Sequence, residues 1–552
     1  MQHKIAIIGI SGLFPGSKNM EELWENLINK KDVTTTATET DFGADTKHFY
    51  HPEKGKVDKC YSLKGGFIRD FEFAAEEYDL KEGLLGRLDD IHKWSLYVAK
   101  EALKDSGYWR TEKGLKDCGL ILGNLSFPTR KSHDHLSEFY TGTLEKGLQE
   151  LISDISTVDK VGNRCQSSSD CKLDATTASS PASIVADVLG LEETHFALDA
   201  ACASSLYAIK FACDYLQTGK ANMMLAGAVS CADPLFIHMG FSIFRAYSKE
   251  GDKFAPLDKD SGGLISSEGA GMLVLKRYED AVRDGDKIHA LISGVGLSND
   301  GKGKFLLSPN PKGQLLALER AYQNSEIEPH QIEYLECHAT GTPLGDKTEV
   351  NTIDSFWGDS KGNDVPLLGS VKSNMGHLLT AAGMSGIIKV ILAMHKGIVP
   401  ASIHLEESLV SQNGLVDKSK IVTEHLLKEV DFAGVNSFGF GGTNGHIVLE
   451  KCKHEYPETQ IRRGVLPKRL PNISKKQKDL ETQTDKDVLV KRLYKAPLVI
   501  VGMDAHFGSC RNLEEFWRVI ASGEQDFGDL PKKRWKGFEE NQELLEAYGL
   551  EG

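Results

Sequence analysis

Short apolar runs alternate with longer amphipathic stretches along most of the chain. The runs at 5–10, 332–335 and 446–449 have the length of buried strands, whereas 203–217 and 383–397 repeat apolar side chains at helical spacing. Strand-like and helix-like segments that alternate in this way predict an α/β architecture.

One turn between a strand and a helix carries a cysteine. Cys202 follows the strand-like segment that ends at Leu198 and precedes the helix-like segment that starts at Ala203, among small neighbours. Free backbone N–H groups and the helix dipole stabilise an anion at such a position. We therefore expect a lowered thiol pKa and a nucleophile that a substrate can reach. A buried structural cysteine is the alternative, and it is the commoner case for a cysteine taken alone.

Three later turns carry polar groups between apolar runs. Their sequences are ECHATGTPLGD at 336–346, VKSNMGHLLTAAG at 371–383 and VNSFGFGGTNGHI at 435–447. A cysteine with one histidine would suggest a general base and acyl transfer. Two histidines and a lysine, without a carboxylate next to them in sequence, also suggest a cluster of donors that stabilises developing negative charge.

In this order and spacing, the four motifs resemble those of the beta-ketoacyl synthases, the condensing enzymes of fatty acid and polyketide synthesis. The resemblance covers Lys4 to Glu450 and includes the stretch PLDKDSGGLISSEGAGMLVLKR at 256–277. DAACASS around Cys202, the opening IAIIGISGLFPGSKNMEELW and FIRDFEF at 67–73 are similar to multidomain polyunsaturated fatty acid synthases or the related heterocyst-glycolipid type. LDDIH at 88–92 departs from the Asp-Pro-Gln segment of modular polyketide synthases.

The resemblance implies a thiolase-like α/β fold, in which two βαβαβαββ halves form an αβαβα layered sandwich with the active site at their junction. The N-terminal half would span about 1–286 and carry the nucleophile. The C-terminal half, about 287–450, would carry both histidines. Members of the family are homodimers, so we expect a homodimer.

The resemblance also assigns roles. Cys202 would take an acyl group from a carrier-protein thioester, and a malonyl group on a carrier would then lose carbon dioxide. The enolate would attack the acyl carbonyl and give a 3-ketoacyl thioester two carbons longer. His338 and His377 would stabilise the enolate, and backbone N–H groups of Cys202 and Phe440 would form the oxyanion hole. The glycines around Phe440 would allow the close approach of the backbone.

Supporting roles follow from the same resemblance. Lys372 would join the histidine cluster through hydrogen bonds and charge, with Glu349 as its partner, and Thr340 and Thr342 would bind the phosphopantetheine arm. Taken alone, Lys372 would be a surface lysine, and a solvated helical position explains Glu349 equally well.

Three further histidines are given no catalytic role. His446 lies in the glycine-rich motif but matches no catalytic position, so we interpret it as structural. His395 and His404 are interpreted as surface or loop residues.

The opening of the chain recurs near its end. Ile7-Ile8-Gly9 is repeated as Ile500-Val501-Gly502, and the match continues at a constant offset (502 − 9 = 493) through Phe507, Asn512 and Trp517. We interpret 495–552 as the truncated start of a second ketosynthase-like unit, similar to a chain-length factor, and 451–494 as a basic, proline-bearing linker. Chance similarity of two amphipathic segments is the alternative.

Composition narrows the possible partners. The chain has 552 residues, 40% hydrophobic and 26% charged, enough for a large core and more than one typical domain. The net charge of −14 argues against nucleic acid. Ten cysteines without a CxxC pair, and no secretory signal, predict reduced thiols in the cytoplasm.

No run is long enough to span a membrane. We expect no metal and no intrinsically bound cofactor, because the substrate would arrive on the phosphopantetheine arm of an acyl carrier protein.

Three other functions fit the sequence less well. Thiolases and starter condensing enzymes resemble Cys-His-Cys or Cys-His-Asn sites, whereas two histidines favour the elongating type. A non-catalytic scaffold or chain-length factor is disfavoured for 4–450 and favoured for the C-terminal piece. The glycines at 439–442 suggest a nucleotide-binding loop, but their spacing fits neither a P-loop nor a dinucleotide fingerprint, and a strand follows them.

Overall fold

The structure is a computed structural model, and not every part of the chain is described. The described residues are 4–111, 115–133, 177–249, 251–302, 308–323, 325–360, 364–453, 501–504, 506–507 and 510–523. The chain divides into two units, the first comprising Met1–His135 and Ser168–Tyr456 and the second comprising Leu136–Ser167 and Pro457–Gly552. All predicted catalytic residues belong to the first unit. The predicted linker at 451–494 lies, beyond Lys453, outside the described residues.

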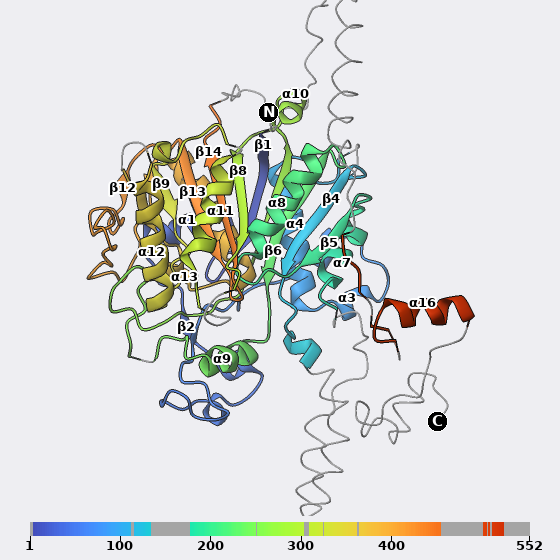
Figure 1. The fold of residues 1–552 in the computed structure, drawn as a ribbon, viewed down its shortest axis with the longest axis horizontal. Helices are drawn as coiled ribbons and strands as arrows, with labels where there is room; N and C mark the ends of the chain where they lie inside the picture. The colour runs from blue at the N-terminus through green and yellow to red at the C-terminus, as the bar shows by residue number, and fades with distance from the viewer. Residues whose placement is uncertain are drawn as a thin grey trace, which may run out of the picture. The chain divides into compact units, whose positions relative to one another are not determined.

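A ten-stranded sheet forms the centre of the first unit. Its strand order is β10-β9-β13-β14-β8-β1-β7-β6-β4-β5, and Figure 1 shows the labelled strands in this order from β9 to β5. The strands are β1 (Ile5–Leu13), β4 (Cys118–Asn124), β5 (His195–Leu198), β6 (Met223–Ser230), β7 (Gly269–Arg277), β8 (Ala290–Asn299), β9 (Tyr334–Glu336), β10 (Leu367–Gly369), β13 (Phe432–Phe438) and β14 (Thr443–Glu450). Five strands come from each predicted half, and the two sets join where β1 pairs with β8 in antiparallel fashion.

Helices cover the sheet in layers. α8 (Ser204–Gln217) and α14 (Ala382–Lys396) pack in a core that both halves share. α4 (Asp90–Asp105) and α7 (Ser180–Leu189) cover the opposite face of the N-terminal strands, and α11 (Pro311–Gln323) and α12 (Pro343–Gly358) pack with the C-terminal strands. In β1, Ile5 and Ile7 belong to the shared core, whereas Ala6 and Ile8 face α4. Because alternate side chains enter different cores, the strand is apolar throughout.

The remaining elements are short or peripheral. The helices are α1 (Met20–Ile28), α2 (Glu39–Phe42), α3 (Leu84–Arg87), α9 (Pro234–Ile243), α10 (Tyr278–Asp284), α13 (Lys372–Met375) and α16 (Leu513–Ser522), with 3-10 turns at Thr46–His48, Ala75–Glu77, Pro329–Gln331 and Leu379–Ala381. Two small sheets pair β2 (Thr35–Thr36) with β3 (Lys64–Gly65) and β11 (Ile398–Val399) with β12 (Leu426–Leu427).

The sequence repeat has the same local structure at both places. Asn19 caps α1 by accepting a hydrogen bond from the Glu22 N–H, and Asn512 caps α16 in the same way through Glu515. A bridge joins Phe14 to Ser17 in the first copy, and another joins Phe507 to Cys510 in the second. The surroundings differ, because Phe14 is 1% exposed and Phe507 is 56% exposed.

Candidate active site

Cys202 lies in a tight turn between β5 and α8, as the sequence predicts. The preceding residue, Ala201, has a φ of +49°, a left-handed conformation that a small side chain tolerates better than a large one. Cys202 is 4% exposed and lines a cavity of about 320 Å³, which we call the Cys202 cavity. The Nε2 atom of His377 lies 3.0 Å from its Sγ. A nucleophile and a base are therefore in direct contact.

The expected lowering of the Cys202 pKa is wrong. Burial raises the pKa of the thiol to about 11, while the backbone N–H of Phe440 and the charge of Lys372 act in the opposite direction. Removing a thiolate from water costs more here than the helix end and the nearby cation return. The thiol is therefore protonated at neutral pH, with Nε2 of His377 within hydrogen-bond distance of it.

The two predicted histidines lie side by side. His338 follows β9 and His377 follows α13, and their ring centroids are 5.2 Å apart with the planes at 86°. Burial and the charge of Lys372 hold the pKa of both imidazoles well below the ordinary value. Within the described residues, Nδ1 of neither ring has a hydrogen-bond partner, so no carboxylate there orients either ring. Both act as neutral imidazoles rather than as members of a Cys-His-Asp triad.

Glu349 is buried, so the solvated alternative for this residue is wrong. Its carboxylate accepts the backbone N–H groups of His338 and Ala339 at 2.8 and 2.7 Å and the side-chain amide of Asn436 at 2.8 Å. Burial raises the pKa of Glu349, and these three donors oppose the shift. Glu349 in α12 therefore fixes the turn that carries His338.

Lys372 is 2% exposed, so the surface alternative is wrong for it as well. Its Nζ donates to the Cys337 carbonyl at 3.4 Å and forms no direct ion pair with Glu349. Burial lowers the pKa of Lys372, and the charges of Glu336 and then Glu349 oppose this lowering. The predicted partnership with Glu349 is thus a charge interaction without direct contact, and Glu336 takes part in it.

The predicted binding residues line the same cavity. Thr340 and Thr342 place their hydroxyls 3.0 Å apart, and both line the cavity together with Phe440. After Phe440 the chain turns through Gly441 and Gly442, with φ of +92° and +87°, which glycine adopts without strain. The turn brings the Phe440 N–H to the Cys202 sulfur.

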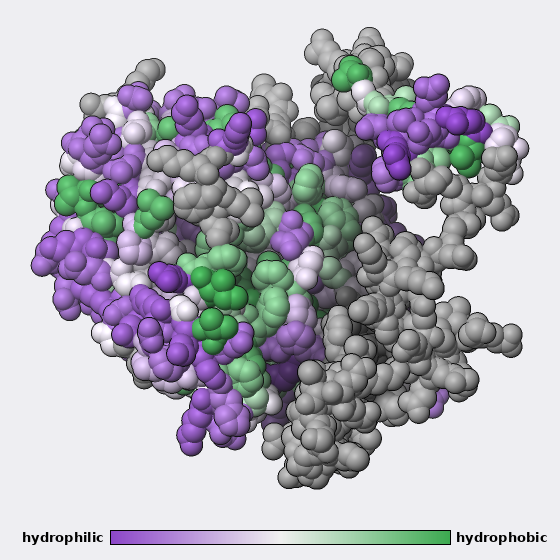
Figure 2. Space-filling view, turned by 60° about the horizontal axis from the view of Figure 1, so that its bottom comes forward, coloured by the Kyte–Doolittle hydropathy of each residue, from purple (hydrophilic) through white to green (hydrophobic). Residues whose placement is uncertain are grey.

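The mouth of the cavity has an apolar rim. Phe244 and Leu344 line the cavity and are largely exposed, and other exposed apolar residues flank or belong to α9, namely Phe127, Phe236 and Ile243. Figure 2, which brings the α9 end of the molecule forward, shows a cluster of apolar side chains near the centre of that face.

Sequence reasoning missed Asp346. This carboxylate accepts the backbone N–H groups of Thr340, Gly341 and Leu257, so it holds the threonine turn. Burial raises its pKa to about 7. The signal was available, because Asp346 and Glu349 lie three residues apart on one helix and therefore share a face.

A second missed group extends behind Glu349. Asn436 donates to Glu349 through its amide N–H and accepts a hydrogen bond from Nδ1 of the buried His446 at 2.6 Å, and the Tyr322 hydroxyl lies 3.3 Å from Nε2 of His446. This position agrees with the structural interpretation of His446. His395 and His404 are exposed, as expected, and contact the carbonyl of His289 and the carboxylate of Asp32.

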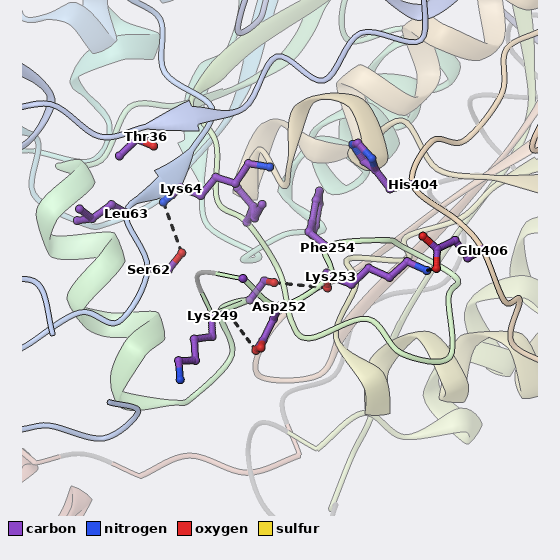
Figure 3. Close-up of a pocket in the computed structure, with 13 residues that line it drawn as sticks. Thr36, Ser62, Leu63, Lys64, Lys249, Asp252, Lys253, Phe254, His404 and Glu406 are labelled. Atoms are coloured by element: carbon purple, nitrogen blue, oxygen red, sulfur yellow. Dashed lines mark hydrogen bonds and ion pairs between the residues drawn. The ribbon is translucent and has the colours of Figure 1, made fainter. Parts of the chain in front are cut away.

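A second cavity, of about 350 Å³, has no thiol in its lining. Its wall includes Thr36 of β2 and Lys64 of β3 together with the loop residues Lys249, Lys253, His404 and Glu406, all of which are labelled in Figure 3. Lys253 pairs with Asp258 and Glu406, and Lys64 pairs with Asp32. Two of the three lysines in the wall are therefore held in ion pairs.

The described residues offer no site of two other classes. No group of three or more His, Cys, Asp or Glu side chains there could hold a metal ion. Among the helices that the structure describes, none combines the length and apolar character needed to cross a membrane. Each cysteine in this part of the chain is a free thiol.

Sequence profiles of known families decide the assignment. The beta-ketoacyl synthase N-terminal domain matches residues 2–281 and again 495–547, and the C-terminal domain of the same family matches 289–406. The chain belongs to the beta-ketoacyl synthase family. This is a family of acyl-transferring condensing enzymes. A third profile, the ketoacyl-synthetase C-terminal extension, matches 414–487 and overlaps most of the stretch interpreted as a linker.

Individual relatives agree with this assignment. The ketosynthase chain is 32% identical over its full length to one of the polyunsaturated fatty acid synthase subunits of Thraustochytrium sp., of which it spans about a quarter (25%). It is similar to the solved structure of a PfaC keto synthase-chain length factor, with 43% identity, a TM-score of 0.85, and coverage of 99% of this chain and 56% of that one. A ketosynthase from module 6 of the bacillaene synthase of Bacillus subtilis matches 82% of this chain and 72% of its own, with 27% identity and a TM-score of 0.68. The predicted thiolase-like α/β fold is confirmed.

Proposed function

We propose that this ketosynthase catalyses the decarboxylative Claisen condensation of an acyl group on Cys202 with malonyl-carrier protein. The observation that carries the proposal is the contact of 3.0 Å between Cys202 Sγ and His377 Nε2, with the His338 ring beside it in one cavity. Similarity to polyunsaturated fatty acid synthases favours that pathway, or a related lipid pathway, over ordinary modular polyketide synthesis.

In the loading step, the Cys202 thiol passes its proton to His377 and attacks the carbonyl carbon of an acyl-carrier thioester. The backbone N–H groups of Cys202 and Phe440 stabilise the oxyanion of the tetrahedral intermediate. The C–S bond to the carrier then breaks, and the carrier thiol leaves with the proton. An S-acyl enzyme remains. Because the resting thiol is protonated, His377 is needed as the proton acceptor.

In the condensation step, the malonyl thioester loses its carboxylate as carbon dioxide, and the bonding electron pair forms an enolate. His338 donates a hydrogen bond to the enolate oxygen, and His377 does the same once its proton has moved from Nδ1 to Nε2, the atom that accepts in the loading step. The enolate carbon attacks the acyl carbonyl, the new C–C bond forms, and Cys202 leaves as a thiolate that takes up a proton from water. The product is a 3-ketoacyl thioester that is two carbons longer.

The partners follow from this chemistry. Acyl and malonyl groups would arrive on the phosphopantetheine arm of an acyl carrier protein, with Thr340 and Thr342 binding the arm at the cavity and no cofactor held by the ketosynthase itself. We further propose a cytoplasmic homodimer. We also propose that 495–552 starts a second, chain-length-factor-like unit without a catalytic role, since a ketosynthase profile matches 495–547.

Replacing the nucleophile tests the proposal directly. Cys202→Ala should abolish acylation of the protein by an acyl-carrier thioester, measured as the mass increase of the intact chain. Cys213→Ala is a matched control, because Cys213 is also a buried free thiol but lies inside α8. Acylation of Cys202→Ala at the wild-type rate would remove Cys202 from the mechanism.

Variants of the two histidines distinguish the loading step from the condensation step. His338→Ala should lower the condensation rate of the preloaded enzyme by about 100-fold or more, the usual effect of losing one donor to a developing oxyanion, and lower loading much less. His377→Ala should impair both steps, because it also loses the proton acceptor. Equal, small losses in loading and condensation for both variants would mean that the histidines are structural.

A further inference from the structure

A buried ion pair lies directly behind the catalytic turns. Lys389 of α14 is 0% exposed and Glu336 at the end of β9 is 1% exposed, and their N–O distance is 2.8 Å. The Tyr334 hydroxyl lies 2.8 Å from both charged groups, accepting from Lys389 and donating to Glu336. Burying two opposite charges in a core adds little to the free energy of unfolding compared with apolar side chains of similar size. The pair therefore calls for an explanation other than stability.

The carboxylate of Glu336 joins three elements. One oxygen holds Lys389, and the other accepts the backbone N–H of Val371, the residue before Lys372, at 2.5 Å. Glu336 itself lies two residues before His338. The same carboxylate therefore connects the strand that carries one catalytic histidine to the turn that carries the lysine.

Two glycines leave room for this arrangement. A Cβ at Gly386 of α14 would lie 3.0 Å from Cγ of Glu336, and a Cβ at Gly369 would lie 2.5 Å from the Tyr334 hydroxyl. Any side chain at these positions would push α14 or β10 away from the pair. Close packing on both sides fixes the position of the carboxylate.

Charge connects the pair to the histidines. Glu336 is the first of the groups that oppose the burial-driven fall of the Lys372 pKa, and the charge of Lys372 in turn keeps the pKa of His338 and His377 low. The titratable and charged groups around Lys372 are Glu336 and Cys337 from β9 and its turn, Glu349 from α12, Cys202 before α8, the two histidines, and Lys389 and Tyr334 on the far side of Glu336.

We propose that the Glu336–Lys389 pair is a positioning device for the condensation step, which fixes the Val371–Lys372 turn and holds the Lys372 ammonium charge beside His338 and His377. The inference rests on the proposed function. Neither residue touches the substrate in this scheme, because both act through Lys372.

Two variants should change the pKa of Lys372 in opposite directions. Glu336→Gln keeps the shape and an acceptor for Val371 but removes the negative charge, so Lys372 loses its proton more easily. The fall of the condensation rate at high pH, which we call the alkaline limb, should move to lower pH by about one unit or more. Lys389→Met leaves Glu336 to interact with Lys372 alone, so the same limb should move to higher pH.

The measurement is single-turnover condensation by enzyme already acylated on Cys202, followed over pH, with the thermal midpoint of each variant alongside. Lys276→Met is the matched control, since Lys276 is a buried lysine whose partners are Asp284, Asp286 and Tyr108. The control should lose thermal stability without moving the limb. If Lys389→Met does not fold, the pH profile of Glu336→Gln tests the proposal by itself.

An unmoved limb in Glu336→Gln, with rates that follow the loss of stability as in the control, would make the pair purely structural and overturn the inference while leaving the proposed function in place. A wild-type chain that loads but never condenses would overturn the proposed function and the inference with it.

Discussion

At Cys202, two physical effects on the thiol act in opposite directions. The end of a helix and a nearby lysine favour the thiolate, and both depend on features that lie close to the sulfur. Burial disfavours the thiolate, and it prevails, raising the pKa to about 11. The contact with His377 then matters more than the intrinsic acidity of the thiol, because the base supplies the ionisation at the moment of attack.

This balance predicts how the thiol reacts with a small reagent. A thiol whose pKa is raised is protonated below that pKa, so the thiolate fraction of Cys202 should rise about tenfold for each pH unit between pH 8 and pH 10. The rate of Cys202 alkylation by iodoacetamide, measured by peptide mass spectrometry, should rise with it and reach no plateau. Glutathione in the same tube is the control and should level off near its own pKa. A plateau for Cys202 below pH 8 would show that burial does not dominate.

At the scale of elements, the site depends on how closely α14 approaches α8. Gly383 in α14 faces the start of α8, where a Cβ would meet Oγ of Ser205 and Cδ1 of Leu206. Cys202 lies two residues before α8, and His377 lies shortly before α14. The close approach of the two helices therefore brings the nucleophile of one half to the histidine of the other.

Gly383→Ala should lower the free energy of unfolding by about 1–3 kcal/mol, because an added methyl in a close-packed core forces neighbours apart. Gly240→Ala is the matched control, since Gly240 is also helical but an added Cβ meets nothing within 4 Å. The control should be neutral or stabilising by up to about 1 kcal/mol. Chemical denaturation of both variants measures the difference, and equal effects would mean that the α8–α14 contact tolerates a side chain.

At the scale of the whole molecule, the chain contains the opening of the fold twice but completes it once within the described residues. Trp24 in α1 packs against the shared core, whereas the matching Trp517 in α16 is 68% exposed. The two copies thus have the same local structure but differ in burial. This difference is expected if the second copy lacks, within the described residues, the strands that cover the first.

The two tryptophans give a paired test. Trp24→Ala should destabilise the first unit by about 2–3 kcal/mol, less than a fully buried aromatic would because Trp24 is only partly buried. Trp517→Ala should leave the thermal midpoint of this chain unchanged within experimental scatter. Differential scanning calorimetry measures both. A large fall in the midpoint for Trp517→Ala would contradict the exposed position of this side chain.

The amino-acid sequence was enough to predict the class of the fold and to single out candidate residues for the active site. Strand-like and helix-like runs gave the alternating elements, because the burial of one face imposes its period on the chain. Cys202, His338, His377 and Phe440 were predicted from motifs that resemble those of a family, and the structure brings all four to one cavity. The repeat at 495–552 was found by comparing the end of the sequence with its beginning.

The electrostatics of the site could be described only from the folded chain. The protonation of Cys202, the hydrogen-bond partners of Glu349, and the contacts of Lys372 and Glu336 depend on segments that are distant in sequence. Desolvation has no local signature, since the water excluded from one residue is excluded by residues elsewhere in the chain. A helix dipole can be inferred from a few neighbouring residues, whereas burial is a property of the folded whole.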